Sequence, residues 1–316
     1  MKTRLAFAAL ALALLPRLAL ADDCRLTQVT SLPITWSADR SILVPATIED
    51  HDELLLIDTA GVYNLLAAQA ADDLHLARRA MNQQTHMTLG VNGKLMSEGA
   101  IAHSFKLGNI TADRMQFAII PDTKMLREKA VGTLGPSVMA NYDVEIDPAN
   151  SRFNLFAQNH CPGQVVYWTR TSYASVPMRV DSFLHIIIPV ELDGHTFEAT
   201  VDTGSSESWI QYDLAAGSFG WSADSRDLTH DDPAHPDSPW YRYGFKTLSL
   251  NGVDIRNPHI AVHKEPGSSG GMTPIIIGMD VLGKLHTFIS YSDKTLYFTG
   301  ANAPPPADTA PPPTAH

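Results

Sequence analysis

The sequence predicts an all-β protein with minor helix, folded as two homologous lobes. Two observations predict this class. The two halves of the 316-residue chain repeat each other in register, and each half consists mainly of short apolar runs separated by turn residues. At 44% hydrophobic and 18% charged residues, the chain can bury a substantial core without a dense set of disulfides or metals.

The repeat is continuous through several blocks. Leu43–Ile48 aligns with Ile187–Leu192 at an offset of 144, and this offset also places Asp58-Thr59 on Asp202-Thr203. After one residue is dropped, a constant offset of 143 aligns three further blocks, which are Phe105–Ile119 with Leu248–Val262, Gly132–Met139 with Ile275–Leu282, and Arg152–Leu155 with Thr295–Phe298. The chain is therefore an internal duplication.

The repeat also predicts the domain organisation. We expect an N-terminal lobe over residues 22–160, a linker over 161–178, a C-terminal lobe over 179–300 and an extended, Pro-rich tail over 301–316. Helix is sparse in the pattern. The main helix is predicted over roughly Asn64–Met81, where four leucines are spaced as a buried stripe, namely Leu65, Leu66, Leu74 and Leu76.

The N-terminus predicts export. Lys2 and Arg4 precede an apolar run over residues 5–15, and Ala19-Leu20-Ala21 stands before Asp22. A basic start, a short apolar run and an A-x-A site are typical of a secretory signal peptide, here over residues 1–21. A membrane anchor needs about 20 apolar residues. We therefore expect a periplasmic or secreted protein with no membrane anchor after signal cleavage.

The chain contains two cysteines, Cys24 and Cys161. In an exported protein the default expectation is one disulfide between them, which joins the mature N-terminus to the end of the first half. The formal net charge of −11 disfavours nucleic acid and anionic membranes as partners.

The two acidic turns carry the recognisable motif. Leu56-Ile57-Asp58-Thr59-Ala60-Gly61 and Thr200-Val201-Asp202-Thr203-Gly204-Ser205 resemble the apolar D-T-G signature of aspartic proteases. Leu134-Gly135 and Ile277-Gly278, 76 or 77 residues after their acids, resemble the apolar-Gly strand that crosses behind the catalytic turn in that family. The resemblance, to retropepsin-like and pepsin-like enzymes, implies two closed-barrel lobes with an active-site cleft between them.

The resemblance also implies the roles of the site residues. Asp58 and Asp202 are the expected catalytic pair, and peptide hydrolysis without a metal needs one group to accept a proton and another to donate one. Thr59 and Thr203 are expected to hydrogen-bond across the lobe interface. In lobe 2, we expect the hydroxyl of Ser205 to donate to Asp202. No metal or organic cofactor is implied, and one chain is sufficient for one site.

The two lobes differ at the motif and at the predicted flap. Ala60 stands where Gly204 stands in lobe 2, and Gly61 lacks the hydroxyl of Ser205. The flap candidate is Leu89-Gly90-Val91-Asn92-Gly93, which contains an Asn-Gly hairpin turn. The equivalent stretch of lobe 2, residues 222–243, is rich in Asp, His and Pro. Its acidic and histidine residues over 230–237 are interpreted as a solvated loop rather than a metal site.

Two functions fit these patterns. The favoured one is an aspartic endopeptidase acting on a peptide or protein substrate. The alternative is a catalytically impaired protein of the same fold that binds peptides or proteins in the periplasm, because a fold does not guarantee its chemistry.

Overall fold

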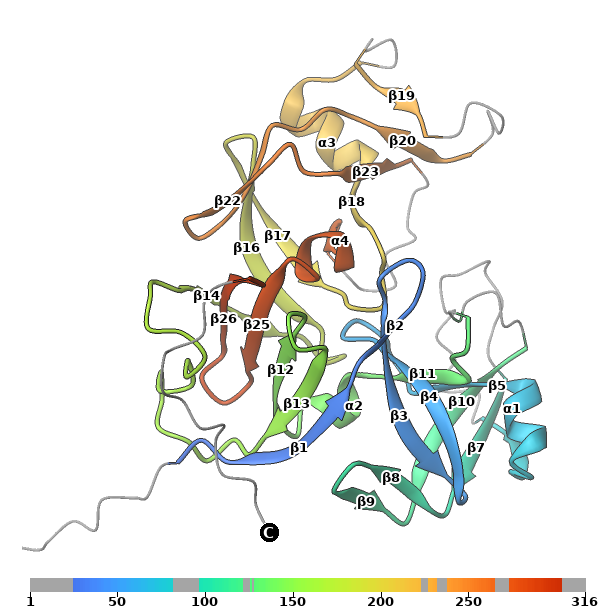
Figure 1. Cartoon of the computed structure of the whole chain (residues 1–316). Coiled ribbons are helices and arrows are strands. Elements are labelled where there is room, and N and C mark those ends of the chain that lie inside the picture. The colour runs from blue at the N-terminus through green and yellow to red at the C-terminus, as the bar shows by residue number, and fades with distance from the viewer. Residues whose placement is uncertain are drawn as a thin grey trace, which may run out of the picture.

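The computed structural model describes residues 25–81, 97–121, 126, 128–222, 227–231, 238–264 and 273–302. These residues form three sheets, one for each lobe and one to which both halves of the chain contribute. In Figure 1 the sheet of lobe 1 lies at the right, the sheet of lobe 2 at the top, and the shared sheet at the lower left. The prediction of an all-β, two-lobed chain with minor helix is confirmed.

Lobe 1 is a ten-stranded sheet with two short helices. Its strand order is β6-β7-β10-β5-β11-β4-β3-β8-β9, with β2 paired to β3, and no pairing among described residues joins β6 to β9. The elements are β2 (Thr35–Trp36), β3 (Ile42–Ile48), β4 (His51–Ile57), β5 (Leu65–Ala67), α1 (Ala68–Asp73), β6 (Arg78–Ala80), β7 (Glu98–Ala102), β8 (Phe105–Leu107), β9 (Ile110–Ala112), β10 (Met115–Ile120), β11 (Gly132–Leu134) and α2 (Pro136–Met139).

Lobe 2 repeats this arrangement in the order β19-β20-β23-β18-β24-β17-β16-β21-β22, with β15 paired to β16. Its elements are β15 (Arg179–Val180), β16 (Ile186–Leu192), β17 (His195–Val201), β18 (Ser208–Gln211), α3 (Tyr212–Phe219), β19 (Thr229–His230), β20 (Trp240–Arg242), β21 (Thr247–Leu250), β22 (Val253–Arg256), β23 (Ile260–His263), β24 (Ile275–Ile277) and α4 (Met279–Leu282).

The third sheet joins the two lobes. Its order is β1-β13-β12-β25-β26-β14, and its strands are β1 (Gln28–Pro33), β12 (Asp143–Asp147), β13 (Arg152–Phe156), β14 (Ala174–Pro177), β25 (Leu285–Ser290) and β26 (Thr295–Gly300). The central pairing is β12 with β25, which places Val144 opposite Ile289. The closing hairpins of the two halves therefore pair with each other, and β14 lies within the stretch predicted as linker.

The hairpin that leads to each acid is built alike in both lobes. β3 pairs with β4 through Ile48 and His51, and β16 pairs with β17 through Leu192 and His195. The two loop residues have positive φ in both cases, at Glu49 and Asp50 in lobe 1 and at Asp193 and Gly194 in lobe 2. Two-residue loops of this kind match the right-handed twist of the strands and fix the register. The end of the second strand, where the acid lies, is thereby fixed too.

The predicted helix over Asn64–Met81 is wrong in extent. Only Ala68–Asp73 is helical, and the residues before it form β5. Leu65 and Leu66 lie inside the sheet, paired with β10 on one side and β11 on the other. Strand pairing on both sides keeps this segment extended, and tertiary context of this kind overrides local helix propensity. The four leucines of the predicted stripe are nonetheless all buried.

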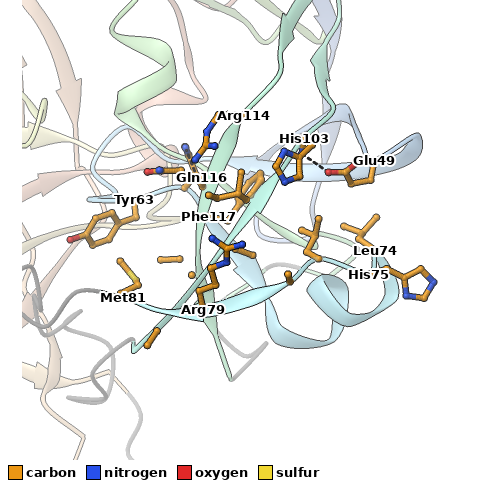
Figure 2. Close-up of a pocket in the computed structure, with 18 of the residues that line it drawn as sticks. Glu49, Tyr63, Leu74, His75, Arg79, Met81, His103, Arg114, Gln116 and Phe117 are labelled. Carbon is orange, nitrogen blue, oxygen red and sulfur yellow. Dashed lines mark hydrogen bonds between the residues drawn. The ribbon is translucent and has the colours of Figure 1, made fainter.

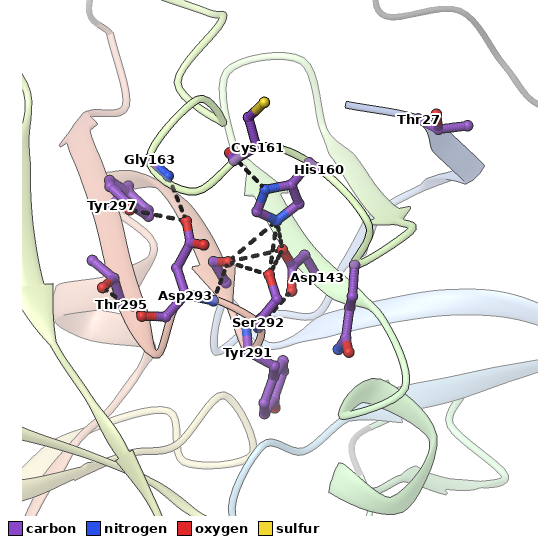
Figure 3. A network of polar contacts seen from close by, with 12 residues as sticks. Thr27, Asp143, His160, Cys161, Gly163, Tyr291, Ser292, Asp293, Thr295 and Tyr297 are labelled. Atoms are coloured by element: carbon purple, nitrogen blue, oxygen red, sulfur yellow. Dashed lines mark hydrogen bonds and ion pairs between the residues drawn. The ribbon is translucent and has the colours of Figure 1, made fainter. Parts of the chain in front are cut away.

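A buried polar network connects the halves at the shared sheet (Figure 3). The Asp143 carboxylate, fully buried on β12, accepts hydrogen bonds from the Ser290 hydroxyl at 2.9 Å and from the Tyr291 N–H at 2.9 Å. It also pairs with the imidazole Nε2 of His160, whose Nδ1 contacts the Cys161 carbonyl at 3.0 Å. Ser292 contacts the same Nε2 at 2.9 Å. Lobe 1 is thus tied to the turn of the lobe 2 hairpin.

The charge on His160 follows from its surroundings. Burial disfavours the imidazolium, but the hydrogen bonds to the Cys161 carbonyl and the Asp143 carboxylate outweigh it and raise the pKa of His160 above the ordinary 6.5. A group whose pKa is higher in the folded state contributes to the free energy of unfolding. This contribution is fully present at pH values below the unfolded-state pKa and is lost as the pH rises through the folded-state pKa.

We therefore expect His160→Asn to reduce the free energy of unfolding by about 1.5–3 kcal/mol at mildly acidic pH, the range for a hydrogen bond to a charged group. The difference from wild type shrinks as the pH rises through and above the His160 pKa. Denaturant unfolding of both proteins across mildly acidic to alkaline pH measures this. A difference that stays constant over that range would contradict a charged His160.

Candidate functional site

The two predicted acids lie in equivalent turns, each at the end of a buried strand. Asp58 follows β4, and its N–H donates to the Leu134 carbonyl at 3.0 Å. Asp202 follows β17, and its N–H donates to the Ile277 carbonyl at 2.9 Å. These acceptors end β11 and β24, which pair in parallel with β4 and β17. The apolar-Gly strands therefore lie beside the acidic turns, as the motif predicts.

Two buried threonines join the turns across the lobe interface. The Thr59 N–H donates to the Thr203 hydroxyl at 3.1 Å, and the Thr203 N–H donates to the Thr59 hydroxyl at 3.0 Å. The Thr59 hydroxyl donates to the Val201 carbonyl at 2.7 Å, and the Thr203 hydroxyl donates to the Ile57 carbonyl at 2.8 Å. Both threonines have 0% exposure. Each hydroxyl acts as donor and acceptor, so the four bonds satisfy the groups reciprocally.

The acidic side chains are anchored by backbone amides of their own turns. The Ala60 N–H donates to Oδ1 of Asp58 at 3.1 Å. Oδ1 of Asp202 accepts the N–H of Gly204 at 2.8 Å and the N–H of Ser205 at 3.1 Å. Amide donors aimed at a carboxylate favour its ionised form and fix its orientation.

Both carboxylates lie close to Gly204. A Cβ atom at Gly204 would lie 2.7 Å from Cγ and Oδ1 of Asp58 and 3.1 Å from Oδ1 of Asp202. The Oδ1 atoms of Asp58 and Asp202 are therefore no farther apart than the 2.7 Å and 3.1 Å distances laid end to end. The structure brings the two predicted acids together at the interface of the lobes, with room only for glycine between them.

Glycine at this turn serves close approach rather than a left-handed backbone. Neither Ala60 nor Gly204 has a positive φ, so the alanine of lobe 1 causes no backbone strain. Gly61 is also crowded, since a Cβ there would lie 2.7 Å from Oδ2 of Asp58. The absence of a side chain at Gly61 thus leaves the space that the Asp58 carboxylate occupies.

The predicted role of the Ser205 hydroxyl is wrong. It donates to the Glu207 carbonyl at 2.7 Å, within its own loop. The backbone N–H of Ser205 is the group that reaches Asp202. Because Gly204 and Ser205 already present two amides to the same oxygen, the hydroxyl turns to a neighbouring carbonyl that has no strand partner.

Two supporting residues were not among the sequence predictions. The Asn64 side-chain oxygen accepts the N–H of Gly135 at 2.8 Å, and the Ser208 hydroxyl accepts the N–H of Gly278 at 2.9 Å. The hydroxyl and the N–H of Ser208 both donate to the carboxylate of Asp280, at 2.6 and 2.8 Å. Burial raises the pKa of Asp280, and these two bonds offset part of that rise. Asn64 and Ser208 each stand six positions after an acid, so the repeat itself carried the signal.

Several predicted features lie outside the described residues. The flap candidate, Leu89–Gly93, is one of them, although the strands on either side of it, β6 and β7, are paired antiparallel. Cys24 is another, so its disulfide with Cys161 stays a prediction, as does the signal peptide. Among the described residues, no group of three potential metal ligands is present, and no helix is long and apolar enough to cross a membrane.

Loss of the threonine bonds is expected to destabilise the interface. In Thr203→Val, the Ile57 carbonyl loses its donor and the Thr59 N–H loses its acceptor, at about 1–3 kcal/mol for each buried group left unsatisfied. Denaturant unfolding measures this loss. Thr203→Ser is the matched control, because it keeps the hydroxyl and removes only a methyl group. Equal stability of the valine and serine variants would show that the cross-lobe bonds contribute nothing.

Comparison with protein families identifies both halves of the chain. A family model described as aspartyl protease matches residues 44–138 and again residues 188–281. The ends of the two matched ranges are related by the same offsets, 144 and 143, as the internal repeat. No curated protein sequence matches the chain significantly.

Solved structures share the fold at low sequence identity. Basic 7S globulin from soybean is 11% identical with a TM-score of 0.50, covering 88% of this chain and 95% of that one. Conglutin gamma, a basic 7S globulin from lupine seeds, is 11% identical with a TM-score of 0.52 and coverages of 88% and 96%. A protein named edgp is 11% identical with a TM-score of 0.52 and coverages of 87% and 95%. These likenesses extend over both lobes.

Proposed function

Because the chain belongs to the aspartyl protease family, we propose that it is an aspartic endopeptidase that hydrolyses peptide bonds with a water activated by Asp58 and Asp202. One observation carries the proposal. The carboxylates of two equivalent turns approach the same glycine, Gly204, and the turns are joined by reciprocal threonine bonds. Such an arrangement supports a pair of acids that act together at the interface of the lobes.

Two carboxylates so placed supply both halves of acid–base catalysis. Like charges at close range resist simultaneous ionisation, so the pair retains one proton, as in aspartic proteases generally. The ionised member accepts a proton from a water molecule while the oxygen of that water attacks the carbonyl carbon of the peptide bond. The protonated member donates its proton to the carbonyl oxygen. Return of a proton to the amide nitrogen then breaks the C–N bond. The shared proton belongs to the pair rather than to one residue.

The surrounding hydrogen bonds support preorganisation of this pair. Catalytic groups need to be held within about half an ångström of the productive geometry. The amides of Ala60 and Gly204 orient the two carboxylates, and Asn64 and Ser208 tie the acidic turns to the strands behind them. The substrate we propose is an extended peptide bound between the lobes. One chain carries both acids, so a monomer is sufficient for one site.

The compartment follows from the N-terminus. We propose that residues 1–21 are removed as a signal peptide and that the enzyme works in the periplasm or outside the cell. The proposed disulfide between Cys24 and Cys161 is compatible with that compartment, where thiols are oxidised.

Removal of either acid tests the proposal. We expect Asp58→Asn and Asp202→Asn each to lower kcat/KM by about 10²–10⁴-fold or more, because the pair loses either its base or its acid. Cleavage of a peptide library from acidic to neutral pH measures this. Asp254→Asn is the control, since Asp254 is an exposed residue of β22 in lobe 2. Cleavage that persists in either site variant would eliminate the shared mechanism.

One observation favours a second candidate, a peptide-binding protein with impaired catalysis. Ala60 carries a methyl group at the position equivalent to Gly204, and at Gly204 itself a Cβ atom would lie 2.7 Å from the Asp58 carboxylate. If that methyl group crowds Asp202, the chain binds peptides and leaves them intact.

The variant Ala60→Gly separates the two candidates. We expect it to increase kcat several-fold by opening the space that Gly204 leaves on the other side. We also expect it to lower the free energy of unfolding by about 0.4–1 kcal/mol, because glycine raises the entropy of the unfolded chain. Single-turnover cleavage and thermal unfolding measure the two effects. Peptide binding without cleavage in both wild type and Ala60→Gly would favour the binding protein.

A further inference from the structure

Lobe 1 contains a cavity of about 1050 Å³ whose charge differs from that of the rest of the chain. It lies beside β6, β7 and β10, and in Figure 2 Tyr63 and Met81 lie at one end of it while His103 and Glu49 lie at the other. Val62 and Tyr63, which line it, directly follow the turn that holds Asp58. Residues that directly follow the Asp58 turn therefore form part of the cavity wall, and all the other lining residues belong to lobe 1 as well.

The cavity lining contains two arginines and several histidines. Arg79 and Arg114 line it and are both exposed, and neither forms an ion pair with a described residue. Three imidazoles line it as well, those of His51, His75 and His103. Glu49 is the only carboxylate among the described lining residues, and it accepts a hydrogen bond from the backbone N–H of His103.

Arg78, the residue before Arg79, differs from it in having acidic partners. Arg78 and Arg79 are neighbours on β6, so their side chains point to opposite faces of the sheet. Arg78 pairs with Asp72 and with Glu98, and it does not line the cavity. In a chain with a net charge of −11, acidic partners are plentiful, yet Arg79 and Arg114 are left with none among the described residues.

A cavity in which one sign of charge predominates concentrates ligands of the opposite sign, and here two guanidinium groups stand against the single carboxylate of Glu49 among the described lining residues. The guanidinium group offers a planar set of donors that fits a carboxylate in two-point contact. Phe117, Leu74 and Leu76 add apolar surface to the same lining, which suits the aliphatic stem of a glutamate side chain.

We propose that this cavity selects peptide substrates with an acidic side chain a few residues from the scissile bond, and that Arg79 and Arg114 are specificity-determining residues. The inference rests on the proposed protease function, because it assigns a substrate class to that site. It would make an acidic protein prefer acidic substrates, against the repulsion of its overall charge.

The test uses matched peptides that differ only in one glutamate or glutamine, placed in turn at each position around the cleaved bond. Binding to full-length Asp202→Asn is measured by fluorescence anisotropy, and kcat/KM is measured with the active protein. We expect the glutamate peptide to be preferred by roughly tenfold at one or more positions, with the preference falling at high salt. In Arg79→Gln and Arg114→Gln this preference shrinks towards one.

Arg78→Gln is the matched control, because it removes a neighbouring arginine from the same strand outside the cavity, and we expect it to keep the full preference. Thermal unfolding of all three variants verifies folding. Equal binding of the glutamate and glutamine peptides, a preference that survives in both cavity variants, or no peptide binding at all would overturn the inference.

The two proposals fail in different ways. Arginine-dependent preference in binding without cleavage by the wild type would support the cavity assignment and contradict the protease. Cleavage that depends on Asp58 and Asp202 but ignores the glutamate would support the protease and overturn the cavity assignment.

Discussion

The reciprocal hydrogen bonds between Thr59 and Thr203 are the constraint on which the site depends. Each threonine follows a strand of its own lobe in the chain and makes these bonds to the other lobe, so a shift of one turn breaks the bonds of both threonines. Because these groups have 0% exposure, water does not replace a broken bond, and each unsatisfied group carries its full desolvation cost. The acids next to the threonines therefore keep their positions only if both turns do.

The shared sheet provides the second connection between the lobes, far from the acids in sequence. Strands β12 and β25 pair directly, and the Asp143 network ties lobe 1 to the turn after β25. The two connections differ in their chemistry. The threonine bonds involve neutral groups, whereas the network contains a buried carboxylate and a histidine whose pKa is raised, so only the second connection contains titratable groups.

The two halves have kept the framework and diverged around it. Both retain the acid, the threonine, the apolar-Gly strand and a polar residue that ties the glycine of that strand. They differ in the residues around this framework, with Ala60 at the position equivalent to Gly204 and an arginine-lined cavity in lobe 1. This division is physically reasonable, because framework groups are buried and mutually satisfied, while residues at the surface of the site change at little cost to stability.

The sequence by itself determined the duplication, the all-β class and the two turns that carry Asp58 and Asp202, because these follow from residue types repeated at a constant offset. It did not determine that Leu65 and Leu66 form a central strand or that the Ser205 hydroxyl turns to Glu207. It also left open that the closing hairpins of the two halves merge into one sheet. Only the tertiary structure decided these features, because each depends on hydrogen-bond partners brought together by folding, and local sequence pattern carries no record of where a backbone group finds its partner.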